Sequence, residues 1–203
     1  MRRQAKNLLL AFSRRVPTKQ ITTMTLMLNF GVVGVYAQPG NVNMTPSGTA
    51  ARSTISLQGT PASEYQLAGY GTLGQFTFRV VNTSMTTPQT STTCSGPTKV
   101  YLPTVAGAGV FRSKNGSLLK VNLMGGGDCI DFAAGEALCI RIFQVVGGTN
   151  GFTHASGTLT LTMTVVPVLA DGPNNPVFFA VTGEVTGTVS GAGTDQRSQD
   201  DQP

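Results

Sequence analysis

The segment GTLTLTMTVV, Gly157 to Val166, decides the fold class of this chain of 203 residues. Apolar side chains alternate with threonines along it, so successive side chains fall on opposite faces of an extended backbone. This period of two predicts a strand with one face against a core and the other toward solvent. The apolar face carries Leu159, Leu161, Met163 and Val165.

The same period recurs on both sides of this segment. The longer predicted strands are 74–82, 117–124, 136–146 and 177–191, and shorter candidates are 54–57, 99–102, 110–112 and 128–132. The segment 136–146, EALCIRIFQVV, is apolar on nearly both faces. No segment shows the apolar spacing of a helix, so we expect an all-β protein.

Glycine-rich breaks have the spacing of hairpin corners, and they fall at 69–74, 107–109, 125–127 and 147–151. Eight or nine strands joined in this way predict an antiparallel barrel of about eight strands, with a β-sandwich as the alternative. Gly183 and Gly187 fall on the apolar face of the last predicted strand. Glycines there indicate coiling or close approach of backbones, which favours the barrel.

The two ends of the chain lack this pattern. Residues 1–37 form a basic region and then an apolar stretch ending in Val-Tyr-Ala, which predicts a secretory signal peptide, with an uncleaved membrane anchor as the alternative. The segment SRRVPTK, Ser13 to Lys19, resembles the twin-arginine export motif in its serine, both arginines and lysine, so the general and twin-arginine routes both stay open. We expect a flexible linker at 38–50, a β-barrel domain at 51–192 and a disordered tail at 193–203.

The net charge of +5 belongs to the N-terminal region. Six of the fourteen basic residues precede residue 20, and from residue 38 onward eight bases face nine acids. No basic patch with interleaved aromatic residues is visible in that part, which disfavours nucleic-acid binding. We therefore expect a secreted or periplasmic protein, or one at the cell exterior, with no nucleic-acid partner and no membrane contact after signal cleavage.

Three cysteines, Cys94, Cys129 and Cys139, lie in the predicted barrel domain, and an oxidising compartment lets two of them pair. A bond between Cys129 and Cys139 across a short hairpin is the simplest arrangement. Cys94 could instead tie its Pro/Ser/Thr-rich loop to either of them. One histidine and no Cys-x-x-Cys pair predict no metal site.

The stretch GGTNGF, 147–152, with Ala-Ser-Gly at 155–157 and an alternating strand after it, resembles the GGTGxF…A.G segment of dirigent proteins. It is also similar to segments of the allene oxide cyclase-like barrels and of uncharacterised bacterial secreted proteins. GQFTF, 74–78, and TGEVTGTVSG, 182–191, resemble an early strand and the last strand of the same proteins, whereas Asn150 stands where they usually have glycine. The resemblance implies an eight-stranded antiparallel barrel, often oligomeric, with a pocket that steers an apolar substrate without a cofactor.

If the apolar faces point inward, the charged residues Arg79, Lys120 and Glu184 lie on the outside of the barrel. The candidate ligand-contacting residues of the interior are then Phe76, Phe78, Leu159, Leu161 and Phe179. Such an interior suits an apolar small molecule.

Arg141 is the one plausible ionisable group for an interior site, because its face of the strand is ambiguous. We interpret it as a structural ion pair or surface residue, with a buried substrate clamp as the alternative. His154 is interpreted as an exposed turn residue, with a proton shuttle as the alternative. The acids Asp128, Asp131 and Glu136 predict a solvated hairpin tip, with a calcium site as the alternative.

No Ser/His/Asp set, paired carboxylates or phosphate-binding glycine loop is visible. The first hypothesis is therefore a secreted, non-enzymatic barrel without a cofactor that binds an apolar small molecule or has a structural role, and that can be a homo-oligomer. The second is a cofactor-free isomerase or cyclase of the dirigent or allene oxide cyclase type, and the third is a surface-adhesive or matrix module. An open apolar interior would favour a binder, convergent ionisable groups a cyclase, and a filled interior a structural module.

Overall fold

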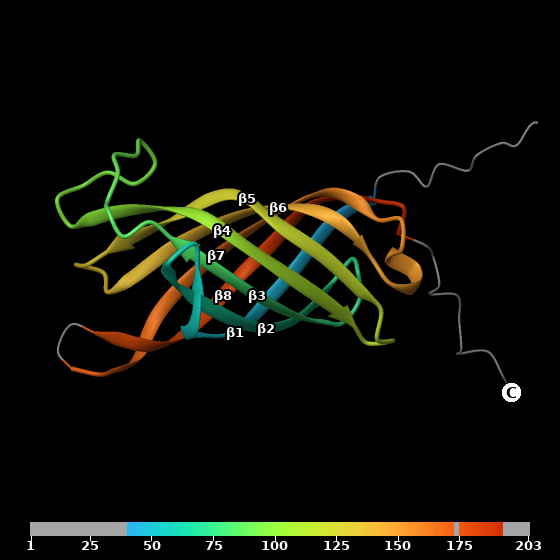
Figure 1. The fold of residues 1–203 in the computed structure, drawn as a ribbon, viewed down its shortest axis with the longest axis horizontal. Coiled ribbons are helices and arrows are strands. Elements are labelled where there is room, and N and C mark those ends of the chain that lie inside the picture. Colours follow the sequence, from blue (N-terminus) through green and yellow to red (C-terminus); the bar gives the residue numbers. More distant parts are fainter. Residues whose placement is uncertain (1–39, 173–174, 193–203) are drawn as a thin grey trace, which may run out of the picture. The chain divides into compact units, whose positions relative to one another are not determined.

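The computed structural model describes residues 40–172 and 175–192, which form a closed barrel of eight antiparallel strands. Each strand pairs with the next along the chain, and the last pairs with the first (Figure 1). The prediction of an all-β, antiparallel, eight-stranded barrel is confirmed. The elements are β1 (Gly40–Leu57), β2 (Thr60–Gly71), β3 (Phe76–Ser84), β4 (Lys99–Ser113), β5 (Leu118–Asp131), β6 (Glu136–Gly148), the short 3-10 helix η1 (Asn150–Phe152), β7 (Ser156–Ala170) and β8 (Pro176–Ser190).

The alternating segment that predicted the fold lies in β7. Leu159 and Leu161 have no exposed surface, whereas Thr158 and Thr162 on the opposite face are exposed. Burying one such leucine stabilises the barrel by roughly 1.5–3 kcal/mol. Within the described ranges, no helix is long and apolar enough to cross a membrane.

The predicted linker at 38–50 is wrong from residue 40 onward, because Gly40 begins β1. Val42, Met44 and Ala50 point inward and are buried, and the strand pairs with both β2 and β8. The glycine, proline and asparagine content suggested a loop, but burial of every second side chain overrides that preference. Residues 1–39 and 193–203 lie outside the described residues, and with them the predicted signal peptide and tail.

Two of the predicted hairpin corners are also wrong. The glycines at 107–109 lie inside β4 and those at 125–127 lie inside β5. The predicted strands 99–102 and 110–112 therefore form one strand, and 117–124 and 128–132 form another. Aromatic side chains cover two of these glycines. A Cβ on Gly109 would lie 2.6 Å from the ring of Phe78, and one on Gly127 would lie 2.4 Å from Tyr101. Strand β2 has a weak alternation, and no strand was predicted there.

The glycines of β8 mark close backbone approach, as expected. Gly187 has a φ of +143°, and a Cβ there would lie 2.1 Å from the carbonyl oxygen of Thr158. Only glycine fits such a position without moving the backbone of β7.

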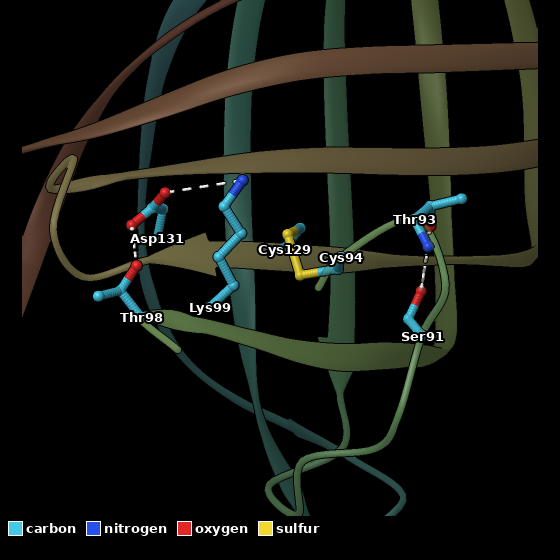
Figure 2. The surroundings of a disulfide bond; sticks show 7 residues. All are labelled: Ser91, Thr93, Cys94, Thr98, Lys99, Cys129 and Asp131. Carbon is cyan, nitrogen blue, oxygen red and sulfur yellow. Dashed lines mark hydrogen bonds and ion pairs between the residues drawn. A yellow bond between two sulfur atoms is a disulfide. The ribbon is translucent and has the colours of Figure 1, made fainter. Parts of the chain in front are cut away.

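The disulfide joins Cys94 to Cys129, so the simplest predicted pairing, Cys129 with Cys139, is wrong. Cys129 lies opposite Leu138 on the outer face, whereas Cys139 points into the barrel and is a buried free thiol. The bond ties the loop between β3 and β4 to β5 (Figure 2). The alternative in which Cys94 pins its loop is therefore the arrangement found. Nearby, Asp131 accepts a hydrogen bond from Thr98 and pairs with Lys99.

Candidate functional site

The inward side chains change in chemistry from one end of the barrel to the other. We call the end where β3 begins the aromatic half, because Phe76, Phe78, Phe111 and Phe143 meet there. We call the end where β3 finishes the polar half. Its polar residues are Tyr65, Asn82, Ser84, Thr104, Asp128, Cys139 and Arg141.

The aromatic half is filled by its own side chains. Phe78 stacks on Phe111 with ring centroids 3.8 Å apart, and it meets Phe143 edge-on at 5.8 Å. A cavity lined partly by Phe76 and Phe111 has a volume of about 10 Å³, which is room for one water molecule. The predicted ligand-contacting residues point inward, with Phe76, Phe78, Leu159 and Leu161 buried and Phe179 half-buried. Of these, Phe76, Phe78 and Leu159 pack among the other buried side chains of the aromatic half.

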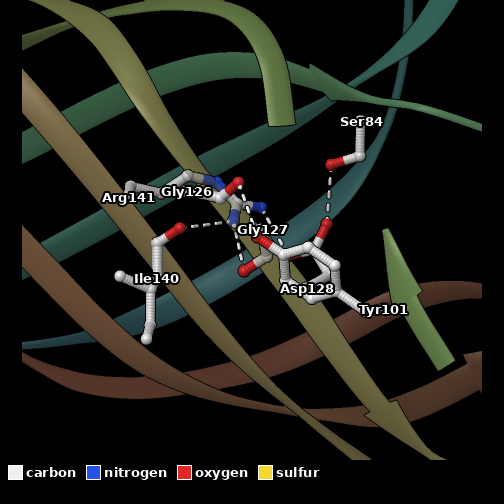
Figure 3. A network of polar contacts seen from close by, with 7 residues as sticks. All are labelled: Ser84, Tyr101, Gly126, Gly127, Asp128, Ile140 and Arg141. Atoms are coloured by element: carbon white, nitrogen blue, oxygen red, sulfur yellow. Dashed lines mark hydrogen bonds and ion pairs between the residues drawn. The ribbon is translucent and has the colours of Figure 1, made fainter. Parts of the chain in front are cut away.

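The polar half is organised around an ion pair between Arg141 and Asp128 (Figure 3). Arg141 has no exposed surface, and the side chain of Asp128 is 15% exposed. The guanidinium Nη2 donates to Asp128 Oδ1 at 2.6 Å, and Nη1 donates to the carbonyl oxygens of Gly127 at 3.2 Å and Ile140 at 3.0 Å. Ser84 donates its hydroxyl to Asp128 Oδ2 at 2.7 Å. The interpretation of Arg141 as an ion-paired residue agrees with this geometry, which also buries it completely.

A β-bulge places Asp128 inside the barrel. Every second side chain of β5 points inward from Leu119 to Leu123. If this alternation continued, Asp128 would point outward. The register with β6 shifts between Leu123 and Gly125, so Met124 is an extra residue that reverses the alternation. Gly126 permits the bulge, because its φ is +125° and a Cβ there would lie 2.0 Å from the carbonyl oxygen of Ile140.

Strand β4 has a register shift of its own at the same level of the barrel. Its pairing with β3 shifts between Thr83 and Ser84, which brings Thr104 opposite Ser84. Tyr101 lies nearby and donates its hydroxyl to the carbonyl oxygen of Gly126 at 3.3 Å (Figure 3). The expectation that Asp128 belongs to a solvated hairpin tip is therefore wrong, since two irregular strands direct it inward.

Burial and the ion pair shift the pKa values of the polar half in opposite directions. Burial by itself would raise the pKa of Asp128, but the charge of Arg141 and hydrogen bonds from Cys139, Ser84 and Arg141 lower it below its ordinary value. Burial raises the pKa of the Cys139 thiol, and the Asp128 charge raises it further. Burial also raises the pKa of Tyr65. The site thus holds one carboxylate and one guanidinium in their charged forms beside a neutral thiol and a neutral phenol.

Three buried polar atoms have no hydrogen-bond partner among the described residues. They are Asn82 Oδ1, Thr104 Oγ1 and Arg141 Nε, and all belong to the polar half. A buried polar atom without a partner costs roughly 1–3 kcal/mol. Asn82 Oδ1 can only accept a hydrogen bond, Arg141 Nε can only donate one, and the Thr104 hydroxyl can do either. A bound hydroxyl or carbonyl group has the chemistry to satisfy such a set.

The opposite wall of the polar half is apolar. Met163 lies across from Cys139, Val165 pairs with Val181, and Ala50 lies across from Phe179. The polar side chains come from β2 to β6, whereas this apolar wall comes from β1, β7 and β8. The interior at this end therefore has one polar side and one apolar side.

The remaining sequence candidates lie elsewhere. His154 is exposed in the turn after η1, as interpreted from the sequence. Arg79, Lys120 and Glu184 are exposed on the outer face, as expected. Asp131 binds backbone N–H groups of its own hairpin and Glu136 is exposed. Within the described residues, no three His, Cys, Asp or Glu side chains come together in the manner of a metal site.

Comparison with known proteins finds no family model that matches the chain and no curated protein of similar sequence. The resemblance to dirigent and allene oxide cyclase-like barrels therefore stays a prediction. The candidate site rests on the geometry of the polar half alone.

Proposed function

We propose that this protein is a non-enzymatic binding barrel that holds an amphipathic small molecule in its polar half. The polar group of the ligand would lie against Asn82, Thr104 and Arg141, and its apolar body against the wall formed by β1, β7 and β8. The packed side chains of the aromatic half would close the inner end of the site. This proposal replaces the wholly apolar ligand expected from the sequence with one that carries a hydrogen-bonding group.

The observation that carries the proposal is the set of three unpartnered polar atoms at one end of the interior. Native proteins pair nearly all their buried polar groups, so an unpaired cluster calls for an explanation such as a bound molecule. Asp128, the ion-pair partner of Arg141, has a partly exposed side chain, which is consistent with access from the polar end. A purely structural barrel would gain stability by replacing these atoms with apolar ones.

A cofactor-free isomerase or cyclase is the second candidate, because two ionisable groups converge at this end of the barrel. The direction of the pKa shifts argues against proton transfer at neutral pH. A carboxylate of lowered pKa is a weak base, and a thiol or phenol of raised pKa is a weak acid. The same groups are well suited to orienting a polar ligand by charge and hydrogen bonds.

We also propose that the chain is exported. The disulfide between Cys94 and Cys129 is compatible with an oxidising compartment. The basic and then apolar N-terminal region has the composition of an export signal. Intact-mass measurement of the protein recovered from its host would test this, with loss of residues 1–37 as the expected result.

The binding proposal is tested by native mass spectrometry and solvent extraction of protein purified from its host. We expect a molecule of fixed mass to accompany the natural protein and to be lost from Asn82→Leu, which removes one acceptor at similar volume. Asn122→Leu changes the same residue type on the outer face and should keep the molecule. Equal retention by both variants would place the ligand elsewhere, and no molecule in any preparation would favour a structural role.

A further inference from the structure

Four basic residues that are scattered along the sequence meet on the outer face of β3, β4 and β5. Arg79 lies opposite Val110, and Val110 lies opposite Lys120 on the next strand. Arg112 lies one row further along, and Lys114 follows β4, where its N–H donates to the carbonyl oxygen of Gln75. The sequence showed no basic patch after residue 38, because these residues become neighbours only through strand pairing.

The same face is hollowed by two adjoining open grooves with volumes of about 630 and 640 Å³. They share Ala68, Thr77 and Arg112 as lining residues. Ala68 and Thr77 line both grooves, so side chains are short along the middle of this face. Tyr70, which is 70% exposed, stands at the edge. We call the combined feature the outer groove.

The positive charge of the outer groove is not neutralised by the rest of the described chain. The two ion pairs found among the described residues are Lys99 with Asp131 and Arg141 with Asp128, and neither lies in the outer groove. The side chains of Arg79, Arg112, Lys114 and Lys120 also make no hydrogen bond within the described residues. Unpaired cations grouped along a groove attract an anion of extended shape.

We propose that the outer groove binds an acidic polysaccharide, a chain of sugars bearing carboxylate or sulfate groups. Arginine presents paired N–H donors that match the two oxygens of such groups, and lysine adds charge without fixed geometry. Gln66 and Gln75 line the grooves and offer amide groups that suit sugar hydroxyls. The groove crosses β1 to β5, a path of about 19 Å at 4.8 Å per strand step.

The geometry favours this partner over two other polyanions. Single-stranded nucleic acid is held by several aromatic side chains that stack on bases, and Tyr70 is the one exposed aromatic residue lining the groove. A membrane surface is broad and flat, whereas a groove encloses a single chain. The outer groove is also separate from the interior site, so this inference stands or falls independently of the proposed binding function.

The test compares binding of the full protein to alginate, heparin, neutral dextran, single-stranded poly(dT) and phosphatidylserine vesicles. We expect binding to alginate or heparin, none to dextran, and a strong decrease with added salt. Arg79→Glu with Arg112→Glu should weaken that binding by at least about tenfold, because each substitution replaces a positive charge with a negative one. Arg52→Glu, an exposed residue of β1 outside the groove, should bind as the natural protein does.

Three results would overturn the inference. They are absence of binding to both acidic polysaccharides, equal binding by the natural protein and the double variant, and preferential binding to poly(dT) or to vesicles. Circular dichroism and thermal melting of the double variant must match the natural protein. If the double variant does not fold, Lys114→Gln removes one charge that lines the groove and Lys120→Gln one that lies beside it on β5. Together they should weaken binding about tenfold.

Discussion

The aromatic half and the polar half of the barrel interior bury their side chains by different means. In the aromatic half, rings such as Phe78 and Phe111 stack against one another and fill the space. In the polar half, a buried ion pair and unpartnered polar atoms occupy the equivalent space. Replacing a buried ion pair with apolar residues is often neutral or stabilising. A barrel built only to be stable would therefore repeat the aromatic half at both ends, which is why the polar half draws the functional proposal.

The largest effect is expected from Asp128→Asn, which breaks the polar half at its ion pair. The substitution leaves the Arg141 charge without a partner, and Arg141 has no exposed surface. Removing one partner of a buried pair costs roughly 3–5 kcal/mol. Urea denaturation should therefore show a loss of that size in the free energy of unfolding.

The matched double variant, Asp128→Asn with Arg141→Met, removes both charges together. It should be more stable than Asp128→Asn alone, because no isolated charge remains in the interior. If the double variant is as unstable as the sum of the two single variants, the pair is not coupled and the ion-pair account of this half is wrong.

A somewhat smaller effect is expected in the aromatic half from Leu159→Ala. Leu159 is fully buried and lies across from Phe143, so its removal leaves a cavity among close-packed side chains. Such truncations cost about 2–5 kcal/mol. The loss should not change between pH 4 and pH 9, because the phenylalanine and aliphatic side chains packed in this half do not ionise. A pH-dependent loss would show that the two halves are coupled.

The polar half, in contrast, should make the free energy of unfolding decrease at low pH and at high pH, and we call these two decreases the acid limb and the alkaline limb. The folded pKa of Asp128 is lowered, so its contribution is present above the ordinary aspartate value of about 3.9 and is lost as the pH falls below it. The folded pKa of Cys139 is raised, so its contribution is present below the ordinary thiol value of about 8.5 and is lost as the pH rises above it.

Urea denaturation curves between pH 3 and pH 10 should show both losses, which are at most about 1 kcal/mol on the acid limb and about 2 kcal/mol on the alkaline limb. Cys139→Ala should remove the first part of the alkaline limb, and it should also reduce the acid limb, because the thiol no longer donates a hydrogen bond to Asp128. An alkaline limb that persists in this variant up to pH 9.5 would assign it to another group.

The aromatic half could be predicted from the sequence because its strands alternate regularly. The inward direction of Phe78 and Leu159 follows from a period of two, and the structure places both in the core. The aromatic stacking and the near absence of free volume could not be predicted, because they depend on which strands face each other across the barrel.

The polar half could not be predicted, because it depends on irregular pairing. A single extra residue, Met124, reverses the direction of every later side chain in β5, including Asp128 and Cys129. This one reversal explains why Asp128 points inward and why Cys129 points outward, away from Cys139. The three glycines before Asp128 were the available signal, since consecutive glycines inside an apolar pattern indicate a bulge as well as a corner. The outer groove could not be predicted for a related reason. Its basic residues lie far apart in the sequence and become neighbours only through the register of β3, β4 and β5.

The smallest effect, and the most specific, distinguishes two buried threonines, Thr104 of the polar half and Thr83 beside it on β3. The hydroxyl of Thr83 donates to the carbonyl oxygen of Pro61 at 3.0 Å, whereas that of Thr104 has no partner among the described residues. Thr83→Val should lower the free energy of unfolding by about 1 kcal/mol, because it removes a made hydrogen bond. Thr104→Val removes a hydroxyl that makes no hydrogen bond and keeps the volume of the side chain. In ligand-free protein it should therefore leave the free energy of unfolding unchanged or raise it by up to about 1 kcal/mol. Thermal melting of both variants with and without the extracted ligand checks this. Thr104→Val should lose the stabilisation that the ligand gives, and an equal loss of stability in both ligand-free variants would mean that Thr104 is already satisfied.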